Sequence, residues 1–206
     1  ACFCNIYFCF YVSKCAFTPK LPAKGRCFYT ELKNSMTEQN LMTAFSGESL
    51  ARNKYTFFAA KARADGFEQI ANLFLETADD ERAHAEIWFN YLGATGKTED
   101  NLTSAAAGEH YEWAEMYDAF AKTAREEGFD DIAVKFELVG KIESEHEKRF
   151  NKLLKNVKDN EVFRSGTAAM WVCGNCGHIH IGEAAPENCP VCGKPRAYFA
   201  IKAENY

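Results

Sequence analysis

Apolar residues recur three and four positions apart along most of the chain from Thr37 onward, which is the spacing of helices with one buried face. No proline occurs between Ala23 and Ala185, and such a stretch suits a core of long helices. The pattern predicts two helical hairpins, with the polar, glycine-containing segment 94–104 as the crossover between them. The four predicted helices run from Thr37, as N-cap, to Gly66, from Phe67 to Gly93, from Ala105 to Glu127 and from Phe129 to Val157.

The second hairpin repeats the first at a constant offset. Two Glu-x-x-His motifs, at Glu81 to His84 and at Glu143 to His146, lie 62 positions apart. Their neighbours differ between the copies, whereas the Glu and the His are kept, so the chain contains a duplicated hairpin. The same offset of 62 relates Tyr55 to Tyr117, Phe58 to Phe120, Arg63 to Arg125, Gly66 to Gly128, Phe67 to Phe129, Ile70 to Ile132 and Phe74 to Phe136.

Each Glu-x-x-His motif directs a carboxylate and an imidazole to the same side of its helix, because residues three apart share a helix face. Two such motifs, with one Glu from each of two partner helices, form the ligand set of a di-iron carboxylate site in a four-helix bundle. Partner acids are present at Glu48 and in the segment Glu109-x-x-Glu112. Burying so many carboxylates is prohibitive unless metal ions neutralise them, so the sequence predicts a di-iron site.

The alternative for each motif is a solvated charged face, since Glu81 lies in a run of charged residues. We favour the metal site because the repeat retains both ligands in each copy. The match between the copies fails on the first helix of each hairpin, where an offset of 62 from Glu48 leads to His110 and the acids are Glu109 and Glu112. The second hairpin therefore offers one carboxylate more than a symmetric site requires.

Four cysteines near the C-terminus have the spacing of a metal site, Cys173-x-x-Cys176 and then Cys189-x-x-Cys192. Four thiolates in this pattern make a closed tetrahedral site. Spacing alone leaves zinc and a single iron ion open, because tetrahedral sulfur suits both. We favour iron, since a one-electron centre has a clear use beside a di-iron site. The other five cysteines fall irregularly within the first 27 residues, which favours a reducing compartment over a disulfide scaffold.

Charge and hydropathy exclude two classes of partner. The net charge of -5, without a basic stripe, gives no reason to expect nucleic-acid binding. No apolar run approaches the roughly 20 residues that span a bilayer. Residues 1–35 differ from the rest, being rich in Cys, Phe and Tyr, with several basic residues against the single acid Glu31. Three interpretations stand for this segment: a targeting presequence, a genuine extension, or translated upstream sequence before a protein that begins near Met36.

Three segments resemble those of rubrerythrins: AFSGES at 44–49, AAGEHYE at 106–112 and ESEHEKRF at 143–150. The resemblance covers residues 36–206. It implies a mainly α fold, with a ferritin-like four-helix bundle at 36–165 and a small rubredoxin-like Cys4 metal domain at 166–206, after an atypical N-terminal extension at 1–35. The framing of the cysteines by aromatic residues and proline resembles that of rubredoxin, and these residues are Trp171, Pro190, Tyr198 and Phe199.

The resemblance also implies roles for the site residues. In this family one iron shifts between a carboxylate and a histidine as its redox state changes. Tyr55 and Tyr117 are candidates for hydrogen bonds to ligands, with ordinary core packing as the alternative, and His110 is a polar surface residue without a role. By match, Glu81 and Glu143 bridge the two irons, Glu48 and Glu109 are terminal on one iron each, His146 binds the second iron, and Glu112 and His84 are the exchangeable pair.

The implied activity is that of a non-haem di-iron peroxidase that reduces hydrogen peroxide to water in oxidative-stress defence. Its cofactors are two iron ions in an oxo- and carboxylate-bridged site and one iron, with zinc as the alternative, in the Cys4 site. Electrons come through rubredoxin or an NAD(P)H-dependent reductase, and a cytoplasmic homodimer or higher homo-oligomer is implied, without nucleic-acid or membrane partners.

Two other functions compete with the peroxidase. One is a ferroxidase or iron-storage protein of the ferritin class, and the other is a zinc-bound structural protein with a vestigial bundle. The extra acid Glu112 and the cysteine module argue against storage, which needs no dedicated electron donor. The complete ligand set argues against a vestigial bundle.

Overall fold

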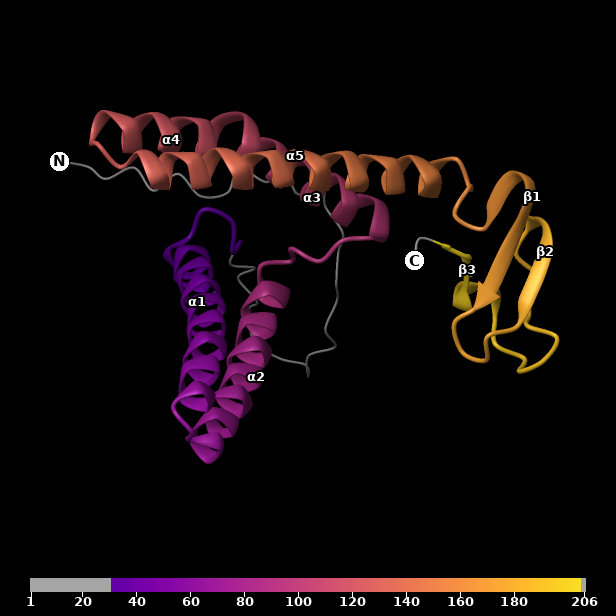
Figure 1. Ribbon diagram of the computed structural model, residues 1–206, viewed down its shortest axis with the longest axis horizontal. Helices are drawn as coiled ribbons and strands as arrows, with labels where there is room; N and C mark the ends of the chain where they lie inside the picture. Colours follow the sequence, from indigo (N-terminus) through magenta and orange to yellow (C-terminus); the bar gives the residue numbers. More distant parts are fainter. Residues whose placement is uncertain (1–30, 205–206) are drawn as a thin grey trace, which may run out of the picture. The chain divides into compact units, whose positions relative to one another are not determined.

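The computed structural model describes residues 31–204, and its secondary structure is mainly helical (Figure 1). The chain divides into two compact units, with the boundary between Gly96 and Lys97. Residues 1–30 of the predicted N-terminal extension lie outside the described residues, and the predicted domain boundaries stay predictions. Within residues 31–204, no helix combines the length and the apolar character that crossing a membrane requires.

The first unit contains a hairpin of two helices, α1 (Met36–Ala64) and α2 (Glu68–Tyr91). Ser35 is the N-cap residue of α1, because its hydroxyl accepts the backbone N–H of Glu38 at 3.1 Å. The prediction of Thr37 as N-cap was therefore wrong. Ser35 has the extended backbone that a cap requires, whereas Thr37 already lies in the first helical turn.

The second unit begins with a hairpin whose first helix changes its winding midway. α3 (Thr98–Tyr111) passes through the π-helical segment η1 (Glu112–Met116) into α4 (Tyr117–Glu126). α5 (Asp130–Lys158) returns alongside them. With α3, η1 and α4 counted as one rod, residues 31–204 contain the four long helices that the sequence predicts.

The two hairpins close with the same turn. Gly66 and Gly128 have φ angles of 86° and 85°, a conformation that residues with a Cβ rarely adopt. The next residue, Phe67 or Phe129, donates its N–H back to the preceding helix, at 2.9 Å and 2.7 Å respectively. The predicted helix ends at these glycines are confirmed, and the backbone repeats as the sequence does.

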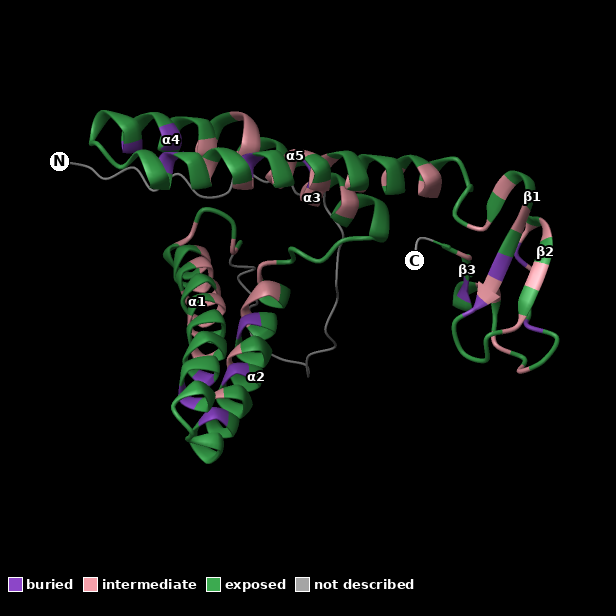
Figure 2. Cartoon of the chain, in the orientation of Figure 1, coloured by how far each residue is buried: buried purple, intermediate pink, exposed green. Residues whose placement is uncertain are grey.

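Small side chains line the interior of each hairpin and let the two helices approach closely. Figure 2 shows how few residues of a hairpin are buried between its own helices. The buried residues again match at the offset of 62, with one phenylalanine packed against each set. They are Ala59, Ala62, Ala71 and the neighbouring Phe74 in the first hairpin, and Ala121, Ala124, Ala133 and Phe136 in the second.

The connection between the hairpins is shorter than predicted. α3 begins at Thr98 rather than at Ala105, so the link is 92–97 and not 94–104. The reason is local: the carboxylate of Asp100 accepts the backbone N–H of Lys97 at 3.2 Å, and Glu99 and Asp100 place negative charge in the first turn. The periodicity of apolar residues cannot predict a helix start that polar residues stabilise.

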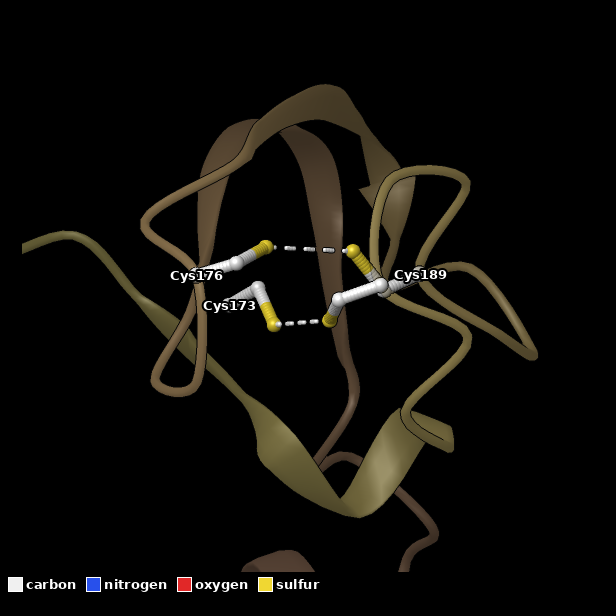
Figure 3. A group of neighbouring side chains, drawn as sticks. Cys173, Cys176 and Cys189 are labelled. Atoms are coloured by element: carbon white, nitrogen blue, oxygen red, sulfur yellow. Dashed lines mark hydrogen bonds between the residues drawn. The ribbon is translucent and has the colours of Figure 1, made fainter.

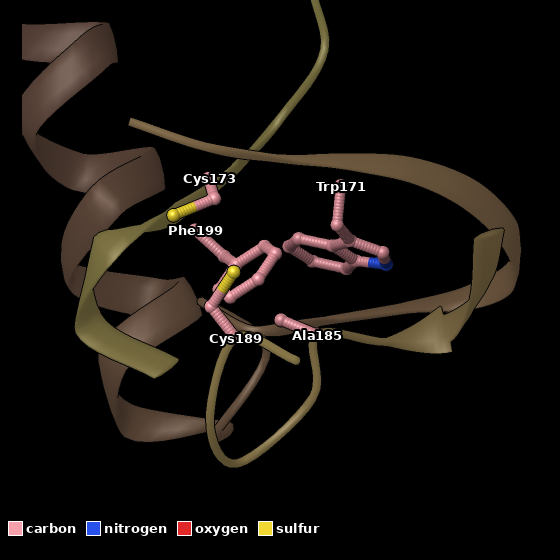
Figure 4. Close-up of a cluster of buried hydrophobic side chains, with 5 residues drawn as sticks. All are labelled: Trp171, Cys173, Ala185, Cys189 and Phe199. Carbon is pink, nitrogen blue, oxygen red and sulfur yellow. The ribbon is translucent and has the colours of Figure 1, made fainter. Parts of the chain in front are cut away.

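The C-terminal domain is a three-stranded antiparallel sheet in the order β2-β1-β3. Its strands are β1 (Arg164–Cys173), β2 (Ile179–Ala184) and β3 (Phe199–Ile201), and the 3-10 helix η2 (Arg196–Tyr198) precedes β3. Figure 4 shows the core, in which Trp171 and Phe199 pack against two of the cysteines. The Trp171 indole N–H donates to the carbonyl of Gly182 at 3.0 Å, so this buried polar group is satisfied.

Candidate metal centres

One group of possible metal ligands lies within the first hairpin. We call Glu48 of α1 with Glu81 and His84 of α2 the first half-site. Nδ1 of His84 lies 2.9 Å from Oε2 of Glu81 and 3.9 Å from Oε2 of Glu48. All three residues offer ligand atoms within 4.8 Å of one another, which is close enough to share one metal ion.

The second hairpin contains an equivalent group. The second half-site consists of Glu109 of α3 with Glu143 and His146 of α5. Nδ1 of His146 lies 2.7 Å from Oε2 of Glu143 and 3.6 Å from Oε2 of Glu109, nearly the same distances as in the first half-site. Each half-site thus brings together the Glu-x-x-His motif and the partner acid that the sequence suggests for it.

The π-helical segment η1 explains why the acids fail to match at the offset of 62. The offset from Glu48 to Glu109 is 61, whereas that from Tyr55 to Tyr117 is 62, so one residue has been added between Glu109 and Tyr117. η1 lies in this interval, and its wider turn, in which the Tyr117 N–H donates to the Glu112 carbonyl, accommodates one extra residue. Glu112, the surplus acid, is its first residue. The change of offset was the signal in the sequence.

Acidic side chains repel one another around the second half-site. Burial, and then the Glu143 carboxylate, raise the pKa of Glu112, while His146 opposes the shift. Burial and Glu143 also raise the pKa of Glu109. Burial and the nearby carboxylates, Glu112 first, raise the pKa of Tyr117 as well. All three shifts disfavour negative charge, so the cluster needs a cation to ionise fully. Carboxylate oxygens with an imidazole are donors that iron accepts, and the residues therefore fit a di-iron group.

The two predicted tyrosines lie in equivalent aromatic clusters. The Tyr55 ring centroid is 6.3 Å from that of Phe58 and 6.1 Å from that of Phe74. The Tyr117 ring lies 6.4 Å from Phe120 and 6.0 Å from Phe136. These contacts account for core packing at both positions. Hydrogen bonds from these hydroxyls to metal ligands stay a prediction.

A polar network beside the second half-site was not predicted. The Trp113 indole N–H donates to Oε2 of Glu147 at 2.6 Å, and Nδ1 of His110 lies 3.2 Å from Oε1 of the same residue. These contacts, the Trp113 hydrogen bond first, hold the pKa of Glu147 below its ordinary value. Glu147 directly follows His146, so the network fixes α5 against α3 and η1 next to a predicted ligand. His110 is exposed, as predicted, but it does have a partner.

The four cysteines of the C-terminal domain converge from two matched turns (Figure 3). Their Sγ atoms approach in pairs, with Cys173 3.7 Å from Cys192 and Cys176 3.6 Å from Cys189. A tetrahedral site with metal–sulfur bonds of about 2.3 Å has sulfur–sulfur edges of about 3.8 Å, so the spacing suits one ion. In each turn a glycine with positive φ donates its N–H to the first cysteine's carbonyl, and these glycines are Gly177 and Gly193.

The thiols of this cluster cannot all ionise in the absence of a cation. The backbone N–H of Lys194 leads the effects that lower the pKa of Cys192 to about 6. At Cys176, a backbone hydrogen bond at His178 lowers the pKa, but burial and the other three thiols raise it to about 12. One thiolate is therefore favoured and another suppressed, and a bound metal ion removes this conflict because it stabilises four thiolates together.

Comparison with known proteins decides the family. The family model described as Rubrerythrin matches residues 39–154 and, in an overlapping match, 100–169. The chain belongs to the rubrerythrin family. A further family model, of the rubredoxin-like domain of rubrerythrin, matches residues 171–200.

Rubrerythrin-1 of Clostridium acetobutylicum is 47% identical over 192 residues, covering 85% of this chain and 98% of the relative. The rubrerythrins of Porphyromonas gingivalis and Nitratidesulfovibrio vulgaris are each 45% identical over 188 residues, covering 85% of this chain and 94% and 98% of their own lengths.

Membership of the rubrerythrin family confirms the predicted fold class, a helical ferritin-like bundle followed by a rubredoxin-like domain. The two half-sites and the four-cysteine cluster match the metal centres of a rubrerythrin, a di-iron protein with a Cys4 iron site. The roles assigned to individual ligands stay predictions.

Proposed function

We propose that this member of the rubrerythrin family is a non-haem di-iron peroxidase that reduces hydrogen peroxide to water in cytoplasmic oxidative-stress defence. The observation that supports the proposal most is the surplus acid Glu112, the first residue of η1, whose pKa responds to Glu143 and His146 of the second half-site, in a chain that also carries a four-cysteine cluster. The overall reaction consumes one peroxide, two electrons and two protons and yields two waters. The electrons come from NAD(P)H through a separate reductase or rubredoxin.

The ligand roles follow the matched motifs. Glu81 and Glu143 would be the ligands shared by the iron pair, Glu48 and Glu109 would each hold one ion, and His146 would hold the second ion. Glu112 and His84 would be alternative ligands to the other ion. When bound, the iron pair supplies the two electrons that cleavage of the peroxide O–O bond requires, and the iron of the Cys4 site passes electrons on one at a time.

Glu112 is suited to carry protons for this reaction. In the metal-free site, burial and then Glu143 raise the pKa of Glu112, so its carboxyl group takes up a proton more readily than an ordinary Glu does when it is not bound to iron. General acids work best when their pKa lies near the working pH, because the protonated form is then populated and also gives up its proton readily. The Glu112 carboxyl delivers a proton to the leaving oxygen of the peroxide and recovers it from solvent. Tyr55 and Tyr117 support the ligands through their hydroxyl groups.

A ferroxidase or iron-storage function is the second candidate, and the two half-sites by themselves permit it. The rubredoxin-like domain favours the peroxidase, because an iron store has no need of a dedicated electron donor in the same chain. The two functions differ in their preferred oxidant, which is peroxide for the first and oxygen for the second.

Replacing Glu112 by alanine should slow the oxidation of the reduced protein by peroxide by roughly 10²- to 10⁴-fold, the usual contribution of a general acid. The Cys4 chromophore should be unchanged. Glu115→Ala is the matched control, since Glu115 is an exposed acid of the same π-helical segment. Stopped-flow mixing of anaerobically reduced protein with peroxide measures both variants. Equal rates for Glu112→Ala and Glu115→Ala would remove Glu112 from the mechanism.

A further inference from the structure

Each hairpin carries a groove between its two helices, and the two grooves are equivalent in the repeat. Positions of α1 correspond to those of α3 at an offset of 61, and positions of α2 correspond to those of α5 at an offset of 62. Three matched pairs of groove residues are Ser49 and His110, Ala85 and Glu147, and Phe89 and Asn151. The second groove therefore has an imidazole, a carboxylate and an amide where the first has a hydroxyl, a methyl group and a phenyl ring.

The polar residues of the second groove form a network around the Glu147 carboxylate. Its Oε2 accepts the Trp113 indole N–H at 2.6 Å, and its Oε1 lies 3.2 Å from Nδ1 of His110. Asn151 also donates to Oε1 through its Nδ2 at 3.5 Å. The His110 ring meets the indole edge-on, with ring centroids 5.3 Å apart and an interplanar angle of 82°. Both carboxylate oxygens are thus engaged, and the indole contacts two partners.

The network bears on the π-helical segment η1, because Trp113 is its second residue and follows Glu112 directly. The backbone of η1 also lies close to α5, since a Cβ added at the buried Gly140 would come within 3.9 Å of the Trp113 Cα atom. The matching residue of the first hairpin is Ala78. Glu147 follows Gly140 by seven residues, about 10 Å along the helix. Two contacts at separate levels of α5 therefore hold η1.

The direction of the Glu112 side chain depends on how η1 is wound. The residue added between Glu109 and Tyr117 turns the side chains after it by about 100° relative to those before it, the rotation of one helical residue. Glu112 lies at this boundary, because it is the first residue of η1. π-helical turns occur mostly as single turns within α-helices, so contacts with other elements decide where such a turn is held. Here the held residue is Trp113, the next residue along.

We propose that Glu147 is a positioning residue of the second half-site. By accepting the Trp113 indole N–H, it fixes the winding of η1 and with it the direction in which Glu112 presents its carboxyl group. Glu147 acts through Trp113 and needs no contact with iron or peroxide. The inference rests on the proposed function, in which Glu112 delivers a proton, and it names what orients that residue. The first hairpin lacks both the added residue and an acid at the position of Glu147.

Hydrogen–deuterium exchange of the full chain tests the winding of η1 without reference to activity. A hydrogen bond to a charged acceptor is lost in Glu147→Ala and in Trp113→Phe, so both variants should exchange the amides of 112–117 roughly 10- to 100-fold faster than the wild type. Glu147→Gln keeps an acceptor for the indole and should recover slow exchange. Glu145→Ala is the matched control, because Glu145 is an exposed acid of α5 that pairs with Lys148. Wild-type exchange at 112–117 in both Glu147→Ala and Trp113→Phe would overturn the proposal.

Oxidation of the reduced protein by peroxide tests whether Glu147 acts through Glu112. Glu147→Ala should slow this step by roughly 10- to 100-fold, the usual cost of a misplaced reacting group, and Glu147→Gln should restore most of the rate. In a Glu112→Ala background, Glu147→Ala should cause no further loss, because the residue that it orients is already absent.

An equal loss in both backgrounds would contradict positioning, since a general structural defect does not depend on Glu112. If Glu112→Ala by itself leaves the rate unchanged, the proposed function of Glu112 fails instead. The exchange measurement still decides in that case whether Glu147 holds η1, so the two failures are told apart.

Discussion

Replacing Glu143 by alanine should abolish the di-iron centre and lower peroxidase activity by about 10³-fold or more, while the Cys4 iron stays bound. Glu143 has only 14% of its side chain exposed, and it lies 2.7 Å from His146. It also contributes to the raised pKa of Glu109, Glu112 and Tyr117. It is therefore the centre of the negative charge that the metal neutralises, and the predicted bridge between the irons.

In the metal-free protein, the same substitution should make the stability less dependent on pH. Because the folded pKa values of Glu109 and Glu112 are raised above the ordinary 4.5, the folded state holds protons that the unfolded state has lost. The metal-free protein should accordingly lose stability as the pH rises above 4.5. Removing the Glu143 carboxylate relieves the repulsion, so Glu143→Ala should flatten this loss.

Metal analysis, a peroxidase assay and thermal unfolding after chelation at several pH values measure these effects. Glu145→Ala is the control, since Glu145 is an exposed acid two residues away that pairs with Lys148. Retention of two di-iron irons per chain by Glu143→Ala, or identical unfolding of both variants at every pH, would contradict this role of Glu143.

Replacing Cys189 by serine should remove the Cys4 iron and reduce NAD(P)H-driven peroxidase turnover to background. Cys189 is buried against Trp171 and Phe199, and its loss leaves three thiols for a site that needs four. Since metal binding and folding are coupled in such small sites, the rubredoxin-like domain should also unfold at lower temperature. A single turnover should still occur when the di-iron site of this variant is reduced chemically and then mixed with peroxide.

Val191→Ala is the matched control, because Val191 lies between Cys189 and Cys192 with 69% of its surface exposed. Visible absorption of the ferric Cys4 site, recorded with steady-state turnover, separates the variants. A wild-type site that is colourless and contains zinc contradicts the assignment of iron, and steady turnover by Cys189→Ser contradicts the assignment of electron transfer to this domain.

Much of the fold was predictable because its determinants are local or periodic. Helices α1, α2 and α5 follow from apolar spacing, and Gly66 and Gly128 end their helices as expected. The start of α3 was missed, because Asp100 and the Lys97 amide stabilise it without any apolar residue. Because of that error, the link between the hairpins was predicted at 94–104 and not at 92–97.

The half-sites were predictable for the same reason. A Glu-x-x-His motif brings its two ligands together through helix geometry alone. The repetition of the motif favoured a metal site over a solvated charged face. The π-helical segment left only an unexplained change of offset in the sequence. The Trp113–Glu147 contact joins residues on different helices of the second hairpin, and neither periodicity nor spacing predicts such a pair.

The most direct test of the peroxidase account is a titration of the wild-type protein. The protein is reduced anaerobically until the ferric Cys4 colour is bleached, and then hydrogen peroxide or oxygen is added in measured amounts. For a peroxidase, the colour should return in stoichiometric proportion to peroxide, with two electrons consumed per peroxide, and faster than with oxygen. Reoxidation that is faster with oxygen, or colour that does not return with peroxide, would contradict it and favour the ferroxidase function.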